Sequence, residues 1–323
     1  MSNFARGLGI FEGDRREALW LKTQLSRHRP DVILAQYGPV ALHLLPVALH
    51  YELPLVVHFH GYDMSRMTRV SWYTRRLRRH LQHFAAIVVV ATYMRDWLVE
   101  NGADPNRIHI IPCGSPISDL IPATHAGNTP CRFLMVGRLV EKKGPDLSLK
   151  AFAACAASCD NAELTIIGDG PLRERCEQIV REAKIEDRVQ WMGVQSNEVV
   201  RKTMSESSIF IQHSVTAADG DKEGWPVSIA EAAGSGLPII STRHAGIVDQ
   251  VDDGVTGYLV DEGDWQTMAD RMIHLAQSPA DRVRMGAAAR AKMLEYDVVK
   301  QVSALEDVLL SAANYKPLRT TVQ

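Results

Sequence analysis

Short runs of β-branched and other apolar residues alternate with longer segments of helical periodicity along most of this 323-residue chain. Ten such runs predict strands, at residues 31–36, 55–59, 86–90, 108–111, 132–136, 163–167, 189–192, 209–212, 238–241 and 257–260. Strands that are separated by helices pair through crossover connections, which make their sheet parallel. The alternation therefore predicts an α/β fold.

Four of these strands precede the segment HAGNTP at 125–130, and six follow it. Glycine, asparagine, threonine and proline together favour an exposed turn, so we expect the linker there. A length of 323 residues also favours two domains. We predict a first domain over 1–125, a second over 126–300, and a C-terminal helix and tail over 301–323 that can return to the first domain. Two doubly wound domains facing one another would leave a ligand cleft at the carboxyl ends of their strands.

Charge and cysteine content exclude several classes of function. The net charge is −2, so no overall basic field exists to hold nucleic acid through its phosphates. The five cysteines are scattered without a CxxC pair, which favours reduced thiols and a cytoplasmic protein over a disulfide framework or a zinc site. No apolar stretch reaches the length of about 18 residues that a membrane span needs, so we expect any membrane contact to be peripheral.

A basic segment follows the strand at 132–136. In GRLVEKKGPD, Gly137 allows close backbone approach, Arg138 offers two parallel donors, and Lys143 adds a point charge beside the start of the next helix. Such a set suits a diphosphate. A solvated basic turn is the alternative, which this segment alone does not exclude.

Two carboxylates flank the start of a later helix, in EGWPVSIAEAAGSGLP. Pro226 fits the first helical turn, which places Glu223 just ahead of the helix and Glu231 about one and a half turns inside it. Ionised carboxylates only accept hydrogen bonds, so they suit the hydroxyl groups of a sugar and a ribose on either side of a diphosphate. The alternative is that Glu223 is a favourable acid before a helix and that Glu231 is a surface glutamate within it. This alternative does not explain the glycines and prolines that surround the two acids.

These segments, together with IIGDGPLRE at 166–174 and HFHGYD at 58–63, resemble retaining glycosyltransferases of the group 1 type, also called family 4, whose fold is the two-domain GT-B fold. The run from Ser214 to Val260 is similar to the exopolysaccharide subgroup, which includes colanic-acid-type enzymes. The resemblance covers residues 31 to about 310. It implies an enzyme that transfers sugar from a nucleotide sugar to a glycan or lipid-linked glycan acceptor with retention of configuration. Together with the cysteine content, this predicts a cytoplasmic protein, which can lie at the inner face of the cell membrane.

The resemblance also implies roles for individual residues. Arg138 and Lys143 would bind the donor diphosphate, Glu223 would contact the transferred sugar, and Glu231 would contact the ribose. His60 would face the transferred sugar from the first domain. The donor-binding set is completed by Gly137, Gly224 and Pro226.

No metal or other cofactor is expected, because Arg138, Lys143 and the helix near Pro226 can stabilise charge on the leaving diphosphate. Asp219 and Asp221 form a DxD pattern that binds metal in the other major transferase fold, but they fall in a polar loop of the second half. His58 is the alternative to His60. Since Gly61 follows His60 at the turn into the expected cleft, we favour His60.

Family members begin with a strand, a glycine-rich or hydroxyl-containing loop and a helix, whereas this sequence opens with MSNFARGLGIFEGD. We therefore expect a truncated first domain, whose absent elements a partner chain could supply. On that basis the alternative function is a non-catalytic nucleotide-sugar-binding protein or a partner-dependent subunit. A nucleotide-sugar 2-epimerase shares the fold, but no motif here resembles it.

Residues 64–84 contain six arginines and no acid, with apolar residues at helical spacing. This pattern predicts a basic amphipathic helix. One interpretation is a solvated helix that packs its apolar stripe on the first domain. The other is contact with an anionic membrane that carries a lipid-linked acceptor.

Overall fold

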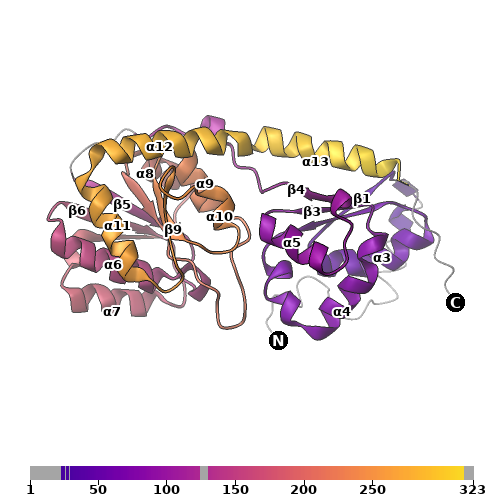
Figure 1. Ribbon diagram of the computed structural model, residues 1–323, viewed down its shortest axis with the longest axis horizontal. Coiled ribbons are helices and arrows are strands. Elements are labelled where there is room, and N and C mark those ends of the chain that lie inside the picture. Colours follow the sequence, from indigo (N-terminus) through magenta and orange to yellow (C-terminus); the bar gives the residue numbers. More distant parts are fainter. Residues whose placement is uncertain (1–22, 26, 29, 124–129, 316–323) are drawn as a thin grey trace. The chain divides into compact units, whose positions relative to one another are not determined.

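The computed structural model describes residues 23–25, 27–28, 30–123 and 130–315 (Figure 1). The described chain forms two compact units, the first ending at Pro112 and resuming at Val302, the second running from Cys113 to Gln301. The border therefore precedes residue 125, where the sequence placed the end of the first domain. The expected linker at 125–130 lies, except for Pro130, outside the described residues, as does the opening segment at 1–14.

All ten predicted strands are present, each within two residues of its expected bounds, and they form two parallel sheets. The first unit has the order β1-β2-β3-β4. Its strands are β1 (Ile33–Gln36), β2 (Leu55–Phe59), β3 (Ala86–Val89) and β4 (Ile108–Ile110). The connecting helices are α3 (Gly38–His50), α4 (Ser71–His80) and α5 (Thr92–Glu100). Right-handed crossovers between sequential strands place all three helices on one face of this sheet (Figure 1).

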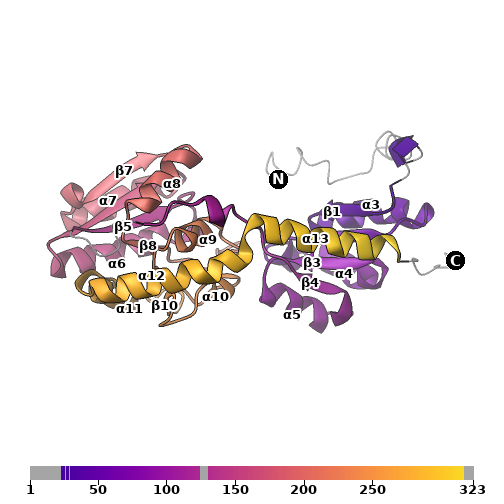
Figure 2. The ribbon, with the colours of Figure 1, turned by 90° about the horizontal axis from the view of Figure 1, so that it is seen from above.

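The other face of the first sheet is covered by the last helix, α13 (Val298–Ala313). Val308 and Ala312 of α13 are buried together with Val56, Val88 and Ile111 of the sheet region. Figure 2 shows α13 lying across β3 and β4. A segment about 200 residues away in sequence thus completes the core of this unit, because strands of a parallel sheet carry apolar residues on both faces.

The described part of the second unit contains a six-stranded sheet in the order β10-β9-β8-β5-β6-β7. They are β5 (Cys131–Val136), β6 (Ala162–Ile167), β7 (Val189–Gly193), β8 (Ile209–Ile211), β9 (Ile239–Thr242) and β10 (Gly257–Val260). Its helices are α6 (Pro145–Ser158), α7 (Arg173–Ala183), α8 (Asn197–Ser205), α9 (Val227–Gly234), α10 (Ile247–Gln250), α11 (Trp265–Gln277) and α12 (Pro279–Met293). Strands β5 to β7 follow one another toward one edge of the sheet, and β8 to β10 follow one another toward the other edge. Because the crossovers are right-handed, the connecting helices of the two halves lie on opposite faces of the sheet.

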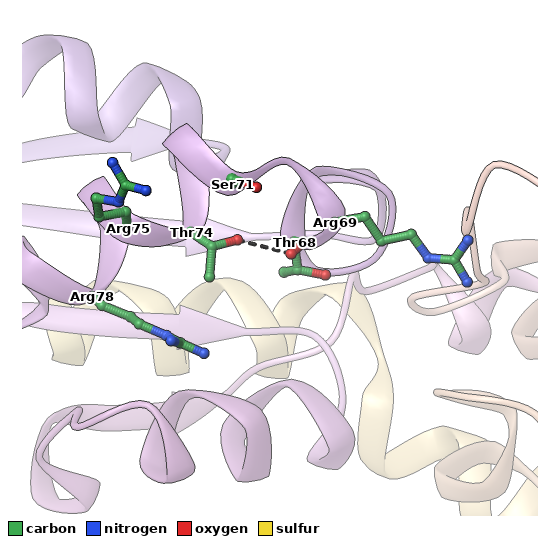
Figure 3. Close-up of a pocket in the computed structure, with 6 residues that line it drawn as sticks. All are labelled: Thr68, Arg69, Ser71, Thr74, Arg75 and Arg78. Carbon is green, nitrogen blue, oxygen red and sulfur yellow. Dashed lines mark hydrogen bonds between the residues drawn. The ribbon is translucent and has the colours of Figure 1, made fainter.

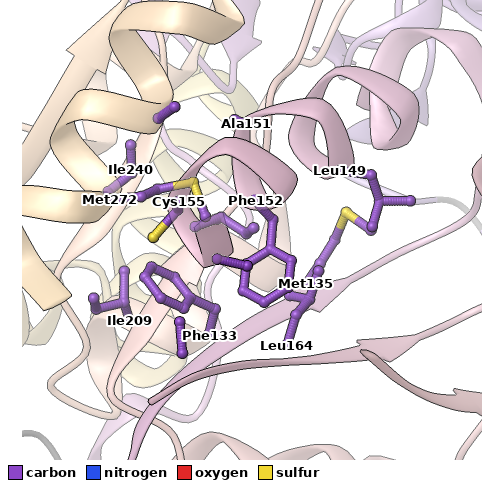
Figure 4. Close-up of a cluster of buried hydrophobic side chains, with 14 of the residues drawn as sticks. Phe133, Met135, Leu149, Ala151, Phe152, Cys155, Leu164, Ile209, Ile240 and Met272 are labelled. Carbon is purple, nitrogen blue, oxygen red and sulfur yellow. The ribbon is translucent and has the colours of Figure 1, made fainter. Parts of the chain in front are cut away.

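The core of the second unit lies between its sheet and the helices α6 and α11 (Figure 4). Phe133 of β5 meets Phe152 of α6 edge to face, with ring centroids 5.8 Å apart. Met272 of α11 and the thiol of Cys155 fill the space beside them. Burial raises the pKa of Cys155 well above that of an ordinary thiol, so this cysteine serves as a small apolar side chain.

Candidate active site

The strand order of the second sheet reverses at β5, whose two neighbours are β6 and β8. Parallel sheets bind ligands outside the carboxyl ends of the strands at such a reversal. Gly137 directly follows β5, and Gln212 directly follows β8. The basic segment predicted from the sequence therefore lies at the position where this fold class places its ligands.

Lys143 and Glu223, which are 80 residues apart in sequence, form an ion pair at this position. The Lys143 Nζ atom lies 3.3 Å from Glu223 Oε2 and donates to Gln212 Oε1 at 3.4 Å. Burial lowers the pKa of Lys143, and the Glu223 carboxylate acts in the opposite direction. The positive charges of Lys142 and Arg138 lower that pKa further.

Glycine fixes the loop that presents Lys143. Gly144 has a φ of +50°, directly precedes α6, and lies so close to His213 that a Cβ atom would overlap the His213 carbonyl oxygen. The Ser148 hydroxyl accepts a hydrogen bond from the His213 backbone N–H at 3.0 Å. The loop after β5 is therefore fastened to the chain after β8.

Gly137 and Arg138 lie at the start of the same loop. Gly137 has a φ of +153°, and a Cβ atom there would contact the Lys143 side chain at 3.5 Å. Arg138 is exposed and forms no ion pair among the described residues. Its guanidinium group is thus available to an anionic ligand beside Lys143.

One carboxylate oxygen of Glu223 has no hydrogen-bond donor among the described residues. Glu223 Oε1 is buried and accepts no hydrogen bond from the part of the chain that is described, although Lys142 Nζ lies 3.9 Å away. Buried acceptors are normally satisfied, so an orphaned oxygen suggests that a ligand donates to it. Lys142 also pairs with Asp221 at 3.1 Å, which engages one aspartate of the DxD pattern. No group of three potential metal-ligating side chains occurs within the described ranges.

The Glu223 backbone is positioned by His244 and Glu262, two residues that the sequence analysis did not identify. The Glu223 N–H donates to His244 Nε2 at 3.1 Å, so the ring proton lies on Nδ1 and is donated to Glu262 Oε1 at 2.5 Å. Burial lowers the pKa of His244, although the hydrogen bond with Glu262 opposes this effect. Because Nε2 accepts a hydrogen bond and so carries no proton, His244 is neutral. His244 lies two positions after β9, and Glu262 lies two positions after the neighbouring strand β10. This position at the carboxyl end of a strand is the signal from which the sequence could have identified them.

Replacing His244 with Phe is expected to lower turnover about tenfold or more, because the buried Glu223 N–H would lose its acceptor at a cost of about 1–3 kcal/mol. Affinity for a nucleoside diphosphate should change little, since the cations remain. Steady-state kinetics and calorimetry on the same preparations measure both quantities. His244→Gln, which can accept and donate at similar positions, should restore part of the turnover, and a loss of affinity as large as the loss of turnover would contradict this role.

The second predicted carboxylate lies on α9, which begins at Val227 with Pro226 as its N-terminal cap. Gly224 and Pro226 are buried, and the Pro226 carbonyl accepts from Gln250 Nε2 at 3.2 Å. Burial raises the pKa of Glu231, and Arg201 of α8 partly offsets this rise. Arg201 was not identified from the sequence.

Gln212 connects the two motifs of the second unit. Its Oε1 atom accepts from Lys143 and lies 3.4 Å from the Ser228 hydroxyl, which donates from the first turn of α9. The structure therefore brings together Lys143, Glu223 and the start of α9, as the sequence analysis proposed for the donor-binding residues.

His60 lies in the first unit, directly after β2. Its Nε2 atom is 2.6 Å from Gln36 Oε1, and its backbone N–H donates to Asp63 Oδ1 at 3.0 Å. Asp63 Oδ2 accepts from the Gly38 N–H at 2.8 Å, so one buried carboxylate joins the ends of β1 and β2. Burial raises the pKa of Asp63 to about 6, while these N–H donors favour its ionised form.

The two histidines of this segment differ in exposure. His58 is buried, and burial lowers its pKa to about 4, whereas His60 is only partly buried. Burial also lowers the pKa of His60. His60 can therefore present a neutral imidazole to a ligand of the first unit.

The two Rossmann-like parallel-sheet units, with a cationic loop and the buried Glu223 carboxylate beside the reversal of the second sheet, are those of the GT-B glycosyltransferase class. The family profile described as glycosyl transferases group 1 matches residues 119–292, and that described as glycosyltransferase family 4 matches residues 4–118. The chain belongs to the group 1 glycosyltransferases.

Curated relatives include exopolysaccharide enzymes. The amylovoran biosynthesis glycosyltransferase AmsK of Erwinia amylovora is 33% identical over 239 residues, covering 74% of this chain and 59% of AmsK. The putative colanic acid biosynthesis glycosyltransferase WcaL of Escherichia coli is 28% identical over 280 residues, covering 85% of this chain and 68% of WcaL. The chain thus spans about six-tenths of the length of AmsK.

Solved structures share the fold. HepE of Anabaena in complex with UDP has a TM-score of 0.79 at 19% identity, covering 91% of this chain and 82% of HepE. Sucrose-phosphate synthase of Thermosynechococcus elongatus has a TM-score of 0.76 at 18% identity, covering 90% of this chain and 77% of the synthase. At these identities the likeness establishes the GT-B fold.

Proposed function

We propose that this protein transfers a sugar from a nucleotide-diphosphate donor to a glycan or lipid-linked glycan acceptor in exopolysaccharide or cell-surface polysaccharide synthesis. The observation that carries the proposal is the Lys143–Glu223 pair. It places a cation for a diphosphate beside a buried carboxylate oxygen that accepts no hydrogen bond within the described chain. A diphosphate and a sugar hydroxyl, joined in one ligand, would satisfy both. The named functions of AmsK and WcaL support the pathway class.

Electrostatic stabilisation of the leaving group is the proposed source of catalysis. Negative charge develops on the nucleoside diphosphate as the glycosidic bond breaks, and preorganised cations stabilise that charge. Lys143 and Arg138 would supply them, while Glu223 would orient the sugar through a hydroxyl group. The resemblance to retaining group 1 glycosyltransferases implies retention of configuration. Since no side chain is assigned as a nucleophile, we propose that the acceptor attacks the same face of the sugar through an oxocarbenium-like state.

The donor experiment starts with uridine nucleotides, because HepE was solved with UDP and the pneumococcal O-GlcNAc transferase GtfA with UDP and GlcNAc. UDP-, GDP- and ADP-sugars are compared by thermal unfolding of the purified chain. A true donor at a hundred times its dissociation constant should stabilise the fold by about 2.7 kcal/mol. NMR of the product then gives the anomeric configuration. Absence of stabilisation by any nucleotide sugar would refute the proposed function, and inversion would refute the mechanism.

We also propose peripheral contact with an anionic membrane at the cytoplasmic face, through exposed arginines of α4 (Figure 3). No helix in the described ranges is long and apolar enough to cross a bilayer. The apolar stripe of α4 is buried in the first unit, since Tyr73 and Leu77 are inaccessible. Arg76 donates to the Leu42 carbonyl at 3.0 Å and so contributes to packing. Membrane contact would therefore rely on charge alone.

The chain is expected to co-sediment with phosphatidylglycerol vesicles at low salt and to dissociate as salt rises, because each arginine near the surface contributes about 1 kcal/mol. Replacing Arg75, Arg78 and Arg79 with Gln should abolish binding. Neutral phosphatidylcholine vesicles are the control. Failure of the unaltered chain to bind anionic vesicles would show that α4 is ordinary solvated surface.

A further inference from the structure

A second lysine lies beside Glu223 Oε1, the oxygen that accepts no hydrogen bond within the described chain. Lys142 Nζ is 3.1 Å from Asp221 Oδ2 and 3.9 Å from Glu223 Oε1. Hydrogen bonds from nitrogen to oxygen span about 2.7–3.2 Å, so the ammonium group binds Asp221 and falls short of Glu223. The side chains of Lys142 and Glu223 are only 17% and 8% exposed, so water screens their charges weakly.

Asp221 is positioned by the loop that ends just before Glu223. The Ala217 N–H donates to the Asp221 carbonyl at 3.0 Å, and the Gly220 N–H donates to the Ala217 carbonyl at 2.8 Å. Gly220 has a φ of +86°, which a residue without a Cβ atom adopts readily. The Asp221 N–H donates to Asp219 Oδ1 at 3.0 Å. These bonds use the backbone of Asp221 and not its carboxylate.

The turn that carries Lys142 is fastened to the same loop. The Val215 N–H donates to the Lys142 carbonyl at 3.0 Å, and the Ala218 N–H donates to Glu141 Oε1 at 3.0 Å. With both backbones held, the ammonium group can still move by rotation within its flexible four-carbon stem. An approach of about 1 Å would bring it within hydrogen-bond distance of Glu223 Oε1.

Such an approach would obstruct the role proposed for Glu223. Hydrogen bonds with an ionised donor are roughly twice as strong as those between neutral groups, so an ammonium group on Oε1 would be preferred to a sugar hydroxyl. The hydroxyl would lose its acceptor. The Asp221 carboxylate prevents this competition, because it gives the ammonium group a nearer partner of opposite charge.

We propose that Asp221 is a positioning residue for glycosyl transfer, which binds Lys142 and so keeps Glu223 Oε1 open to a hydroxyl group of the transferred sugar. This inference rests on the proposed function, because it takes Glu223 as the carboxylate that orients the sugar. It assigns a role to the second aspartate of the DxD pattern, which the proposed mechanism does not use.

The first test needs no ligand. Asp221→Asn removes the charge with little change in size, and in a crystal structure of this variant Lys142 Nζ should lie about 2.9 Å from Glu223 Oε1. Asp219→Asn is the matched control, because it removes the same charge from the same loop while Asp221 stays beside Lys142. In the control the ammonium group should remain on Asp221. An Asp221→Asn structure in which Lys142 stays away from Oε1 would overturn the inference and leave the proposed function intact.

The second test measures turnover with whichever of the UDP-, GDP- and ADP-sugars stabilises the chain most. Asp221→Asn should lower turnover about tenfold, because the sugar hydroxyl must then displace a charge-assisted hydrogen bond. Affinity for the nucleoside diphosphate should not fall, since that ligand lacks the sugar. Adding Lys142→Gln to Asp221→Asn should restore most of the turnover, because the competing ammonium group is gone.

The double variant separates positioning from a merely structural role, since a loop damaged by the loss of Asp221 is not repaired at Lys142. A double variant as slow as Asp221→Asn would overturn the inference. So would a loss of diphosphate affinity in Lys142→Gln as large as that in Lys143→Ala, because Lys142 would then be a diphosphate ligand. Lack of stabilisation of the unaltered chain by every nucleotide sugar would refute the proposed function and this role together, whereas the other outcomes refute the role alone.

Discussion

Glu223→Gln should lower the turnover number about 10²-fold while affinity for the nucleoside diphosphate is retained or rises. The orphaned Oε1 atom is the proposed acceptor for a hydroxyl of the transferred sugar, which the product nucleotide lacks. Loss of one preorganised contact that acts in the transition state costs about 10²–10³ in rate. The same change removes the anion 3.3 Å from Lys143, so the cation becomes more available to the diphosphate.

Glu231→Gln is the matched comparison, because it neutralises the second carboxylate of the same motif. Its proposed partner is the ribose, which donor and product share, so both ligands should bind more weakly. Turnover at saturating donor should fall much less than in Glu223→Gln. Calorimetry with UDP and the nucleotide sugar, together with initial rates, separates the two roles. Equal losses of diphosphate affinity in the two variants would contradict the assignment.

The sequence predicted the parallel sheets and assigned Lys143 and Glu223 to one donor site, but it did not predict their ion pair. Strand and helix periodicities are local, and parallel strands direct their carboxyl ends to one edge, where the following loops meet. Residues that follow β5 and precede α9 could therefore be assigned to one site although 80 residues separate Lys143 from Glu223. The comparisons confirm the fold and the family that this pattern predicted.

The partners of these residues could not be found in the same way. Gln212, His244 and Glu262 carry no motif of their own, and their contacts depend on which strands become neighbours. The burial of the apolar stripe of α4 and the bond from Arg76 to the Leu42 carbonyl likewise depend on tertiary packing. So does the unit border after Pro112, because Ser115 pairs with Asp297 and thereby joins 113–123 to the second unit.

Lys143→Ala is expected to weaken binding of nucleoside diphosphate and nucleotide sugar alike, by about 1.5–3 kcal/mol, or roughly ten- to a hundredfold. The two losses of affinity should be equal because the Lys143 ammonium group contacts the phosphates that both ligands share. Arg138→Ala should have a similar effect on affinity. Calorimetry with both ligands measures these changes, and unchanged affinities in both variants would refute the diphosphate assignment.

Stability should separate these two variants. Lys143 is paired with the buried Glu223. Its removal leaves Lys142, at 3.9 Å, as the one cation beside that carboxylate among the described residues, so the melting temperature should fall. Arg138 is exposed and unpaired within the described chain, so Arg138→Ala should melt near the unaltered protein. The double variant Lys143→Ala/Glu223→Gln should regain stability without regaining affinity. A double variant as unstable as Lys143→Ala would show that the ion pair does not stabilise the fold.

The pH dependence of binding provides an independent check on Lys143. Burial lowers its pKa below the ordinary value of 10.5, so the protonated fraction begins to decline at a lower pH than for an exposed lysine. Because the diphosphate binds the protonated form, affinity should fall as pH rises through that lowered pKa, and binding in this range should take up a proton. In Lys143→Ala this decline should disappear, whereas Arg138→Ala should retain it. A decline that persists in Lys143→Ala would assign the titration to another group and remove Lys143 from the diphosphate contact.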